Sequence, residues 1–286
     1  MLSGVVLDSF RIRHKCGRPP HSNISDPAWK DDVIGFRRVD SSELQRLGLG
    51  QYQYAWFFTT IITDATVLLA FLLDRFRKLG GQTVTAKVDS LELEALRKHF
   101  PANSLSASTV VVNCTGIGAL PLCGDTTLRP CRGQTLRVKA PYVKHFFDEG
   151  LGNKNDNDPS KLVYVFPRLN EVLLGGTYEE NQWDRTSSQE TAEGIRSRCA
   201  ELVPELRHAP EVKRWVGLRP VRPTVRLEWD AEVEARLRKG ACSHRLIHNY
   251  GHGGSGLTLF WGCAQEVATK VHQQLTNRVT TPISRL

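Results

Sequence analysis

The stretch RLIHNYGHGGSGLTLFWGCAQEVATKVH, residues 245–272, decides how the fold is interpreted. A short apolar run leads into the loop Gly251–Gly256, which has the spacing G-x-G-x-x-G, and the loop opens an amphipathic stretch. Glycines let the backbone come close to a ligand, and the first N–H groups of a helix are free to meet negative charge or an electron-rich oxygen. The pattern therefore predicts a strand, a glycine loop and a helix.

This loop lacks the rest of a dinucleotide-binding unit. In such a unit the helix returns to a second parallel strand, which ends in an Asp or Glu about 20 residues after the loop. Here Gln274, Leu275 and Thr276 occupy that place, and no apolar run follows them. The loop is therefore either a glycine-rich helix cap without a ligand or one wall of a cofactor site whose other walls lie elsewhere.

The composition indicates an ordinary globular protein of one or two domains. The chain has 286 residues, of which 40% are hydrophobic and 24% charged. The net charge of +8 is spread along the chain without an aromatic-interleaved basic strip, so we expect no nucleic-acid partner. The seven cysteines include no C-x-x-C pair, which favours a reducing compartment over a disulfide framework or a zinc site. We expect a soluble protein without a secretory signal or a membrane span.

The hydrophobic patterns predict a mixed α/β fold, with a layered α/β domain and an antiparallel sheet. Strands are expected at 33–39, 55–62, 83–88, 109–112, 134–138, 162–166 and 171–174, and helices at 65–79 and 189–206. The last two strands flank a turn and predict an antiparallel hairpin. Residues 1–24 are expected to be irregular. The polar segment 150–159 is interpreted as a surface loop or as a mobile lid over a pocket.

A second unusual segment, residues 215–226, carries arginines between prolines. Two X-Pro steps hold it extended, so Arg222 and Arg226 share a face while Arg219 points away. A rigidly held guanidinium suits bidentate binding of carboxylate or phosphate, although a cation-rich surface turn is the alternative. Tyr164, on an apolar strand, is either a residue at the edge of the core or a hydroxyl donor in a pocket. The pair of histidines at 248 and 252 is interpreted as structural.

Taken together and in order, these segments resemble the D-amino-acid oxidase family, which includes D-aspartate oxidase. The resemblance rests on residues 26–36, 110–116, 132–134, 217–223 and 248–258. It implies an FAD oxidase that transfers a hydride from a D-amino acid to flavin and passes the electrons to O2. The products would be hydrogen peroxide, ammonia and a 2-oxo acid. The resemblance implies no general base, because orientation and electrostatics do the work.

The resemblance also assigns site residues. Arg222 and Tyr164 match the residues that bind the substrate carboxylate, and the carbonyl of Gly254 matches the acceptor for the substrate amine. The matching FAD contacts are Val88, Thr115, Arg222, Gly253, Gly254, Gly256, Leu257 and Thr258. The FAD-binding, Rossmann-like domain would comprise residues 80–134 and 216–286, and the substrate domain residues 25–79 and 135–215.

Several positions depart from the family pattern. Nothing in residues 1–20 resembles the N-terminal ADP-binding unit, so the chain is expected to be an N-terminally truncated member. Ser160, Ser255 and Phe260 replace residues common in relatives. Tyr178 stands where D-aspartate oxidase would have arginine, which favours a neutral D-amino acid. The alternatives are D-aspartate oxidase, a related flavin enzyme acting on glycine or sarcosine, and a non-catalytic product unable to hold FAD.

The sequence ends in Ser284-Arg285-Leu286, which is similar to the S-K-L peroxisomal address. We therefore expect a peroxisomal import receptor as a partner and the peroxisomal matrix as the location. A homodimer is left open.

Overall fold

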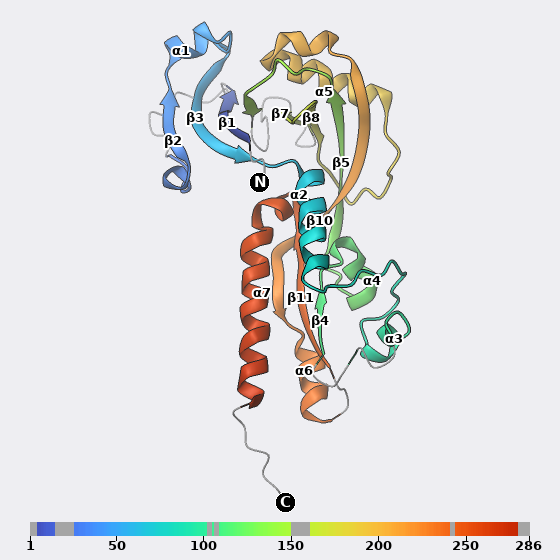
Figure 1. The fold of residues 1–286 in the computed structure, drawn as a ribbon. Helices are drawn as coiled ribbons and strands as arrows, with labels where there is room; N and C mark the ends of the chain where they lie inside the picture. The colour runs from blue at the N-terminus through green and yellow to red at the C-terminus, as the bar shows by residue number, and fades with distance from the viewer. Residues whose placement is uncertain are drawn as a thin grey trace, which may run out of the picture. The chain divides into compact units, whose positions relative to one another are not determined.

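The computed structural model describes residues 5–14, 26–101, 105, 109–149, 161–240 and 244–279. The chain divides into two compact units. Unit 1 comprises Met1–Asp74 and Arg132–Gly217, and unit 2 comprises Arg75–Cys131 and Leu218–Leu286. Helices and strands occur in both units, which confirms the mixed α/β class (Figure 1).

Unit 1 is built on a largely antiparallel sheet. Its strands follow the order β2-β3-β1-β6-β7-β8-β5, and only the β1–β6 pair is parallel among the pairings described. The strands are β1 (Val5–His14), β2 (Ile34–Val39), β3 (Tyr52–Ile62), β5 (Arg129–Val138), β6 (Phe146–Asp148), β7 (Lys161–Pro167) and β8 (Val172–Thr177). The two-residue strand β9 (Glu179–Glu180) pairs with β5.

The core of unit 1 lies between this sheet and helix α5 (Gln189–Leu202), which packs on β7 and β8 (Figure 1). Towards the end of β5 buried residues alternate with half-buried ones, and Leu136 and Val138 are fully buried. They meet Ile195 and Cys199 of α5 in one hydrophobic cluster. The 3-10 helix η3 (Pro204–His208) follows α5, because Pro204 cannot continue the helix.

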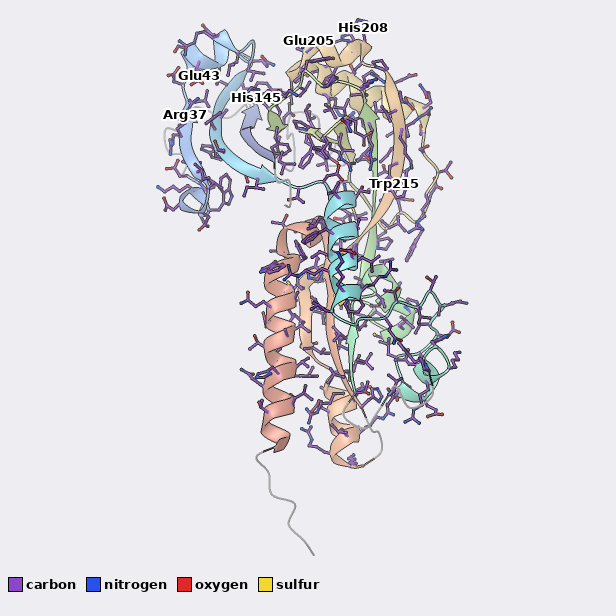
Figure 2. All side chains as sticks on the ribbon, in the orientation of Figure 1. Arg37, Glu43, His145, Glu205, His208 and Trp215 are labelled. Atoms are coloured by element: carbon purple, nitrogen blue, oxygen red, sulfur yellow. The ribbon has the colours of Figure 1, made fainter. Side chains whose placement is uncertain are left out.

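Shorter elements complete unit 1. They are η1 (Lys30–Asp32), α1 (Ser41–Arg46) and the start of α2 (Ala65–Lys78). Arg37 of β2 donates two hydrogen bonds to Glu43 of α1, which ties the helix to the strand beside it (Figure 2). Asp64 accepts a hydrogen bond from the backbone N–H of Thr66, so it caps α2 as the sequence predicts.

Unit 2 is organised around β11 (Arg245–His252). This strand pairs in parallel with β4 (Val110–Asn113) and antiparallel with the end of the long strand β10 (Glu211–Trp229). The helix α7 (Gly256–Val279) lies along β11 (Figure 1). Ala119, Leu128 and Tyr250 form a small core of their own. The remaining elements are α3 (Leu93–Arg97), η2 (Gly116–Gly118), α4 (Ala119–Cys123), α6 (Ala231–Arg238) and η4 (Gly253–Ser255).

Two expectations about secondary structure are wrong. Residues 83–88 form no strand; their side chains are mostly exposed, and the segment has no paired neighbour among the described residues. The expectation that residues 1–24 are irregular fails for Val5–His14, which form β1 because the long strand β3 supplies a partner along their length. The hairpin β7–β8, the extended segment in β10 and the β11–loop–α7 unit are confirmed. The loop 150–159, Ser160 and the C-terminal tripeptide lie outside the described residues.

Candidate functional site

The glycine loop connects β11 to α7 in unit 2. Gly251 and Gly253 have φ angles of 86° and 56°, in the left-handed region that side-chain-bearing residues rarely adopt. These two residues turn the chain from the strand into η4 and then into the 24-residue helix. Gly254, Leu257 and Thr258 are exposed, so a ligand can reach this turn.

The loop packs against the arginine-proline segment of β10, because its glycines leave room. A Cβ on Gly251 would lie 3.0 Å from Cβ of Arg222, and one on Gly254 would lie 3.6 Å from Cδ of Arg219. Val221 pairs with His252 across the two strands. Two segments that the sequence analysis treated separately are therefore neighbours in one site.

Arg222 is largely buried and is held at its Nε edge. Its Nε donates to Oδ2 of Asp125 at 2.9 Å, its Nη1 donates to the carbonyl oxygen of Thr224 at 3.1 Å, and 19% of its side chain is exposed. Arg226 approaches the same carboxylate oxygen at 4.0 Å. The prediction that Arg222 and Arg226 share a face is confirmed. The alternative of a surface turn is wrong, because residues 211–229 form one strand.

The carboxylate of Asp125 is the centre of this cluster. Its Oδ1 accepts hydrogen bonds from the backbone N–H and the hydroxyl of Thr127, at 3.1 and 2.6 Å, and its Oδ2 also accepts one from the hydroxyl of Tyr250 at 2.8 Å. Burial alone would raise the pKa of Asp125, but the hydrogen bonds from Thr127, Tyr250 and Arg222 outweigh it and hold the pKa far below its ordinary value. Burial, with the neighbouring carboxylate, raises the pKa of Tyr250 to about 12, so its hydroxyl stays protonated and donates.

A second buried chain of hydrogen bonds lies behind Thr115. Nδ2 of Asn113 lies 3.1 Å from Nδ1 of His248, and Nε2 of His248 lies 2.9 Å from Oδ2 of Asp230. Since an amide NH2 only donates, Nδ1 must accept, and the ring proton sits on Nε2 facing Asp230. Oδ1 of Asn113 accepts from both the N–H and the hydroxyl of Thr115. His248 is therefore structural, as the sequence analysis predicts, and it fixes the end of β4.

The residues around the loop fit a flavin cofactor. Nε2 of His252 and Oδ1 of Asn249 are buried and have no hydrogen-bond partner within the described part of the chain, so they are available to a polar ligand. On the first two turns of α7, Leu257 is 54% and Trp261 67% exposed, which leaves apolar surface for an aromatic ring. A helix N-terminus, unpaired polar atoms and apolar surface together suit a ring that is apolar on its faces and polar at its edge.

Tyr164, the other predicted carboxylate ligand, lies in unit 1. It pairs with Gly175 between β7 and β8, and its ring lies over the Gly175–Gly176 backbone. A Cβ on Gly175 would fall 1.7 Å from Cζ of Tyr164, so only glycine admits the ring there. The remaining predicted flavin contact, Val88, lies outside regular structure in unit 2, whereas Thr115, Arg222 and the loop residues gather around β11.

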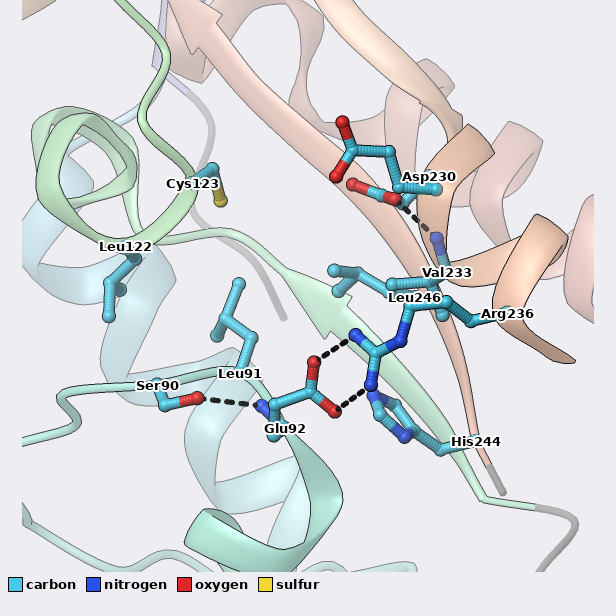
Figure 3. A pocket seen from close by; sticks show the side chains of 11 residues that line it. Ser90, Leu91, Glu92, Leu122, Cys123, Asp230, Val233, Arg236, His244 and Leu246 are labelled. Atoms are coloured by element: carbon cyan, nitrogen blue, oxygen red, sulfur yellow. Dashed lines mark hydrogen bonds and ion pairs between the residues drawn. The ribbon is translucent and has the colours of Figure 1, made fainter. Parts of the chain in front are cut away.

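Unit 2 also contains a cavity of about 210 Å³ away from the predicted residues (Figure 3). Arg236 in its lining donates to both carboxylate oxygens of Glu92, and Asp230 and Glu232 add two further carboxylates to the lining. Negative charge and an engaged guanidinium make the cavity a poor site for an anionic substrate. No group of three or more His, Cys, Asp or Glu residues arranged to hold a metal occurs among the described residues.

Sequence reasoning missed Asp125, Tyr250 and the Gly175–Gly176 pair. Asp125 begins the pattern D-x-T, in which an aspartate accepts hydrogen bonds from a threonine two residues later. That pattern signals a turn, but it does not indicate which distant arginine the second carboxylate oxygen will meet. Likewise, the glycine pair signals backbone freedom but does not name the ring that covers it.

Comparisons with known proteins show the family of this chain. Residues 20–270 match the family described as FAD dependent oxidoreductase. The chain is 36% identical to the D-aspartate oxidase of Homo sapiens over 261 residues, which cover 91% of this chain and 68% of that protein. It is 39% identical to the D-amino-acid oxidase of Rubrobacter xylanophilus, covering 85% of this chain and 66% of that protein.

A likeness to solved structures supports the same fold. Glycine oxidase from Geobacillus kaustophilus superposes with a TM-score of 0.67 at 18% identity, covering 95% of this chain and 72% of that one. The fold and the site thus define a flavin-dependent oxidoreductase. The chain belongs to the FAD-dependent oxidoreductase family, with D-amino-acid oxidases and D-aspartate oxidases among its relatives, and FAD is the cofactor of this family. It spans about two thirds of the length of these two curated relatives. No helix in the described ranges is long and apolar enough to cross a membrane.

Proposed function

We propose that this chain is an FAD-dependent oxidase of neutral D-amino acids. The observation that carries the proposal is the placement of Arg222, whose stem packs on the glycine loop of a site that fits a flavin and whose guanidinium is held by Asp125. A substrate carboxylate and the cofactor would then be bound by adjacent segments of unit 2. Family relatives named D-amino-acid oxidase support the same reaction.

The residues of the site bind and orient. Arg222 neutralises the substrate carboxylate through its Nη atoms, and the carbonyl of Gly254 accepts from the substrate amine. These contacts direct the Cα–H bond of one enantiomer toward the cofactor, and they need no general base.

The cofactor would be held by Val88 and Thr115, by Arg222, and by the loop and first turn of α7 at Gly253, Gly254, Gly256, Leu257 and Thr258. Bound FAD would supply two-electron oxidation and the reaction with O2, giving hydrogen peroxide, ammonia and a 2-oxo acid. The N-terminal end of α7 favours negative charge at the ring edge.

The preference for a neutral side chain rests on Tyr178. It follows Leu174-Gly175-Gly176-Thr177, where an arginine would be needed to bind a second carboxylate. The competing candidate is a D-aspartate oxidase, which the 36% identity to the human enzyme favours. Oxygen consumption by the FAD-loaded chain with D-alanine and with D-aspartate separates the two. A faster rate with D-alanine is expected, and an equal or faster rate with D-aspartate would reject the preference.

The role of Arg222 has its own test. Arg222→Ala should raise the KM for D-alanine roughly tenfold to hundredfold, because a charge-assisted bond to the substrate is lost. Arg214→Ala is the matched control, since Arg214 lies on the same strand and pairs with Glu211 outside the site. An unchanged KM in Arg222→Ala would show that Arg222 does not bind the substrate carboxylate.

The location is part of the proposal. Ser284-Arg285-Leu286 would direct the chain to the peroxisomal matrix through its import receptor. A fluorescent protein carrying this C-terminal segment should enter peroxisomes, and one from which the three residues are deleted should not. If both fusion proteins were found in the same cellular location, the role of the C-terminal tripeptide as a peroxisomal targeting signal would be rejected. Whether the chain forms a homodimer is to be measured by sedimentation of the FAD-loaded protein.

A further inference from the structure

Oδ2 of Asp125 accepts a hydrogen bond from the Nε–H of the Arg222 guanidinium. We propose that Asp125 is a positioning residue: it fixes the Nε edge of Arg222 so that the Nη atoms are presented to the substrate carboxylate. The inference rests on the proposed function, in which Arg222 binds that carboxylate. Nη2 has no hydrogen-bond partner among the described residues, whereas Nε and Nη1 are engaged by Asp125 and Thr224.

The carboxylate is itself immobilised from two elements. Thr127 binds Oδ1 from the turn before β5, through its backbone N–H and its hydroxyl. Tyr250 binds Oδ2 from β11, and Nη1 of Arg226 in turn donates to the Tyr250 hydroxyl at 2.8 Å. With two donors on each oxygen, the carboxylate cannot rotate without breaking a hydrogen bond, so it holds Arg222 in one orientation.

The stem of Arg222 is fixed independently. The missing side chain of Gly251 leaves a space in which Cβ and Cδ of Arg222 lie, at 3.0 and 3.1 Å from the position a Cβ would take. The side chain is thus confined at its stem by β11 and at its Nε by Asp125. A guanidinium ordered before the substrate arrives loses less entropy on binding, which favours affinity.

A purely structural role for Asp125 makes a different prediction. In that case the carboxylate only neutralises Arg222 and Arg226, whose charges would otherwise be unbalanced in a partly buried place. Its loss would then lower the free energy of unfolding and leave substrate affinity unchanged. A positioning role requires affinity for carboxylates to fall as well.

The test compares Asp125→Asn with Leu128→Ala in the FAD-loaded chain. Asparagine keeps the shape of aspartate but places an NH2 or an uncharged oxygen against the donor Nε–H of Arg222. Leu128 belongs to the small core of unit 2 with Ala119 and Tyr250, so its truncation destabilises the same region without touching Arg222. The measurements are kcat and KM with D-alanine, the dissociation constant of propionate by calorimetry, and the midpoint of thermal unfolding.

We expect Asp125→Asn to raise KM and to weaken propionate binding by the same factor, roughly tenfold, with a smaller change in kcat. Leu128→Ala should lower the unfolding midpoint and leave both binding measures unchanged. Asp125→Glu, which restores the charge, should recover part of the affinity. Should Asp125→Asn fail to fold, Tyr250→Phe removes one of the bonds that orient the carboxylate and should shift KM in the same direction by less.

Two results would overturn the inference, and they are distinguishable. If the parent chain oxidises D-alanine while Asp125→Asn or Tyr250→Phe keeps the parent KM and propionate affinity, Asp125 does not position Arg222 and the proposed function stands. If the parent chain binds neither FAD nor propionate, the proposed function and the positioning role both fail.

Discussion

At position 251 the absence of a side chain decides where Arg222 lies. The positive φ of Gly251 turns β11 toward α7, and the same residue leaves the space that the Arg222 stem occupies. Gly251 therefore has two roles: it allows the turn of the backbone, and it makes room for a side chain of the neighbouring strand β10. Sequence inspection predicts the first role, because G-x-G-x-x-G indicates a tight turn, but the second depends on a contact 29 positions away in the chain that no local pattern encodes.

At the residue scale, His248 predicts a pH dependence of stability. Burial lowers its pKa below the ordinary value of 6.5, and this effect outweighs the neighbouring Asp230 carboxylate that favours the charged ring. As the pH falls through 6.5, the unfolded chain binds a proton that the folded chain takes up only at lower pH. The free energy of unfolding should therefore decrease as the pH falls below 6.5.

Denaturant unfolding at several pH values checks this expectation. His248→Gln should make the free energy of unfolding less dependent on pH. Arg226 and Glu228 also act on the pKa of His248. Part of the pH dependence should remain, because burial also lowers the pKa of His252. His208→Gln is the control, because His208 lies exposed at the end of η3 (Figure 2). A slope in His248→Gln as steep as in the parent chain would contradict the buried neutral histidine.

At the element scale, the β7–β8 hairpin holds the Tyr164 ring over Gly175. Gly175→Ala forces a methyl group into that ring, so we expect a loss of about 1–3 kcal/mol in the free energy of unfolding. Gly262→Ala, in the middle of α7 with open space around it, should instead stabilise the chain by about 0.5–1 kcal/mol. In a Tyr164→Ala background the cost of Gly175→Ala should largely disappear, since the two residues are in contact. If the losses in the free energy of unfolding from Gly175→Ala and Tyr164→Ala were additive in the double variant, the contact between the two residues would be disproved.

The attachment of α5 to β5 gives another prediction at this scale. Gln134, fully buried, donates to the carbonyl oxygen of Ser188 and accepts from its N–H, at 2.7 and 2.8 Å. Gln134→Ala leaves both backbone groups without this partner, so the free energy of unfolding should fall by about 2–4 kcal/mol. Gln189→Ala, one residue further on and exposed, should change it by less than about 0.5 kcal/mol. Equal effects in the two variants would argue against this anchor.

Elements were predicted well where the pattern was strong and badly where pairing decided the outcome. Two short apolar runs with a turn between them defined β7 and β8, and the prolines at 220 and 223 kept β10 extended. Residues 83–88 have the same β-rich composition, yet a strand requires a neighbour with which to exchange hydrogen bonds. Whether a neighbouring strand is present depends on the whole fold, and the hydrophobic periodicity of the segment does not predict it. Val5–His14 illustrate the opposite case, in which β3 supplied the partner.

At the scale of the whole molecule, the chain consists of two units with separate cores, and the predicted residues divide between them. The predicted flavin contacts and Arg222 belong to unit 2, and Tyr164 belongs to unit 1. Ordered motifs in the sequence were enough to indicate the family, and two of them, the glycine loop and the arginine-proline segment, pack together in the structure. The supporting residues Asp125, Asn113 and Tyr250 became visible only when the strands carrying them were brought side by side.

The central claim is that this chain holds FAD and uses it to oxidise D-amino acids. The most direct measurement is the visible absorption of the purified chain after incubation with FAD and desalting, followed without oxygen on addition of D-alanine or L-alanine. We predict that the bands of oxidised flavin are retained, that D-alanine but not L-alanine bleaches them, and that admitting O2 restores them. Loss of all flavin on desalting, or bleaching at equal rates by both enantiomers, would contradict the account.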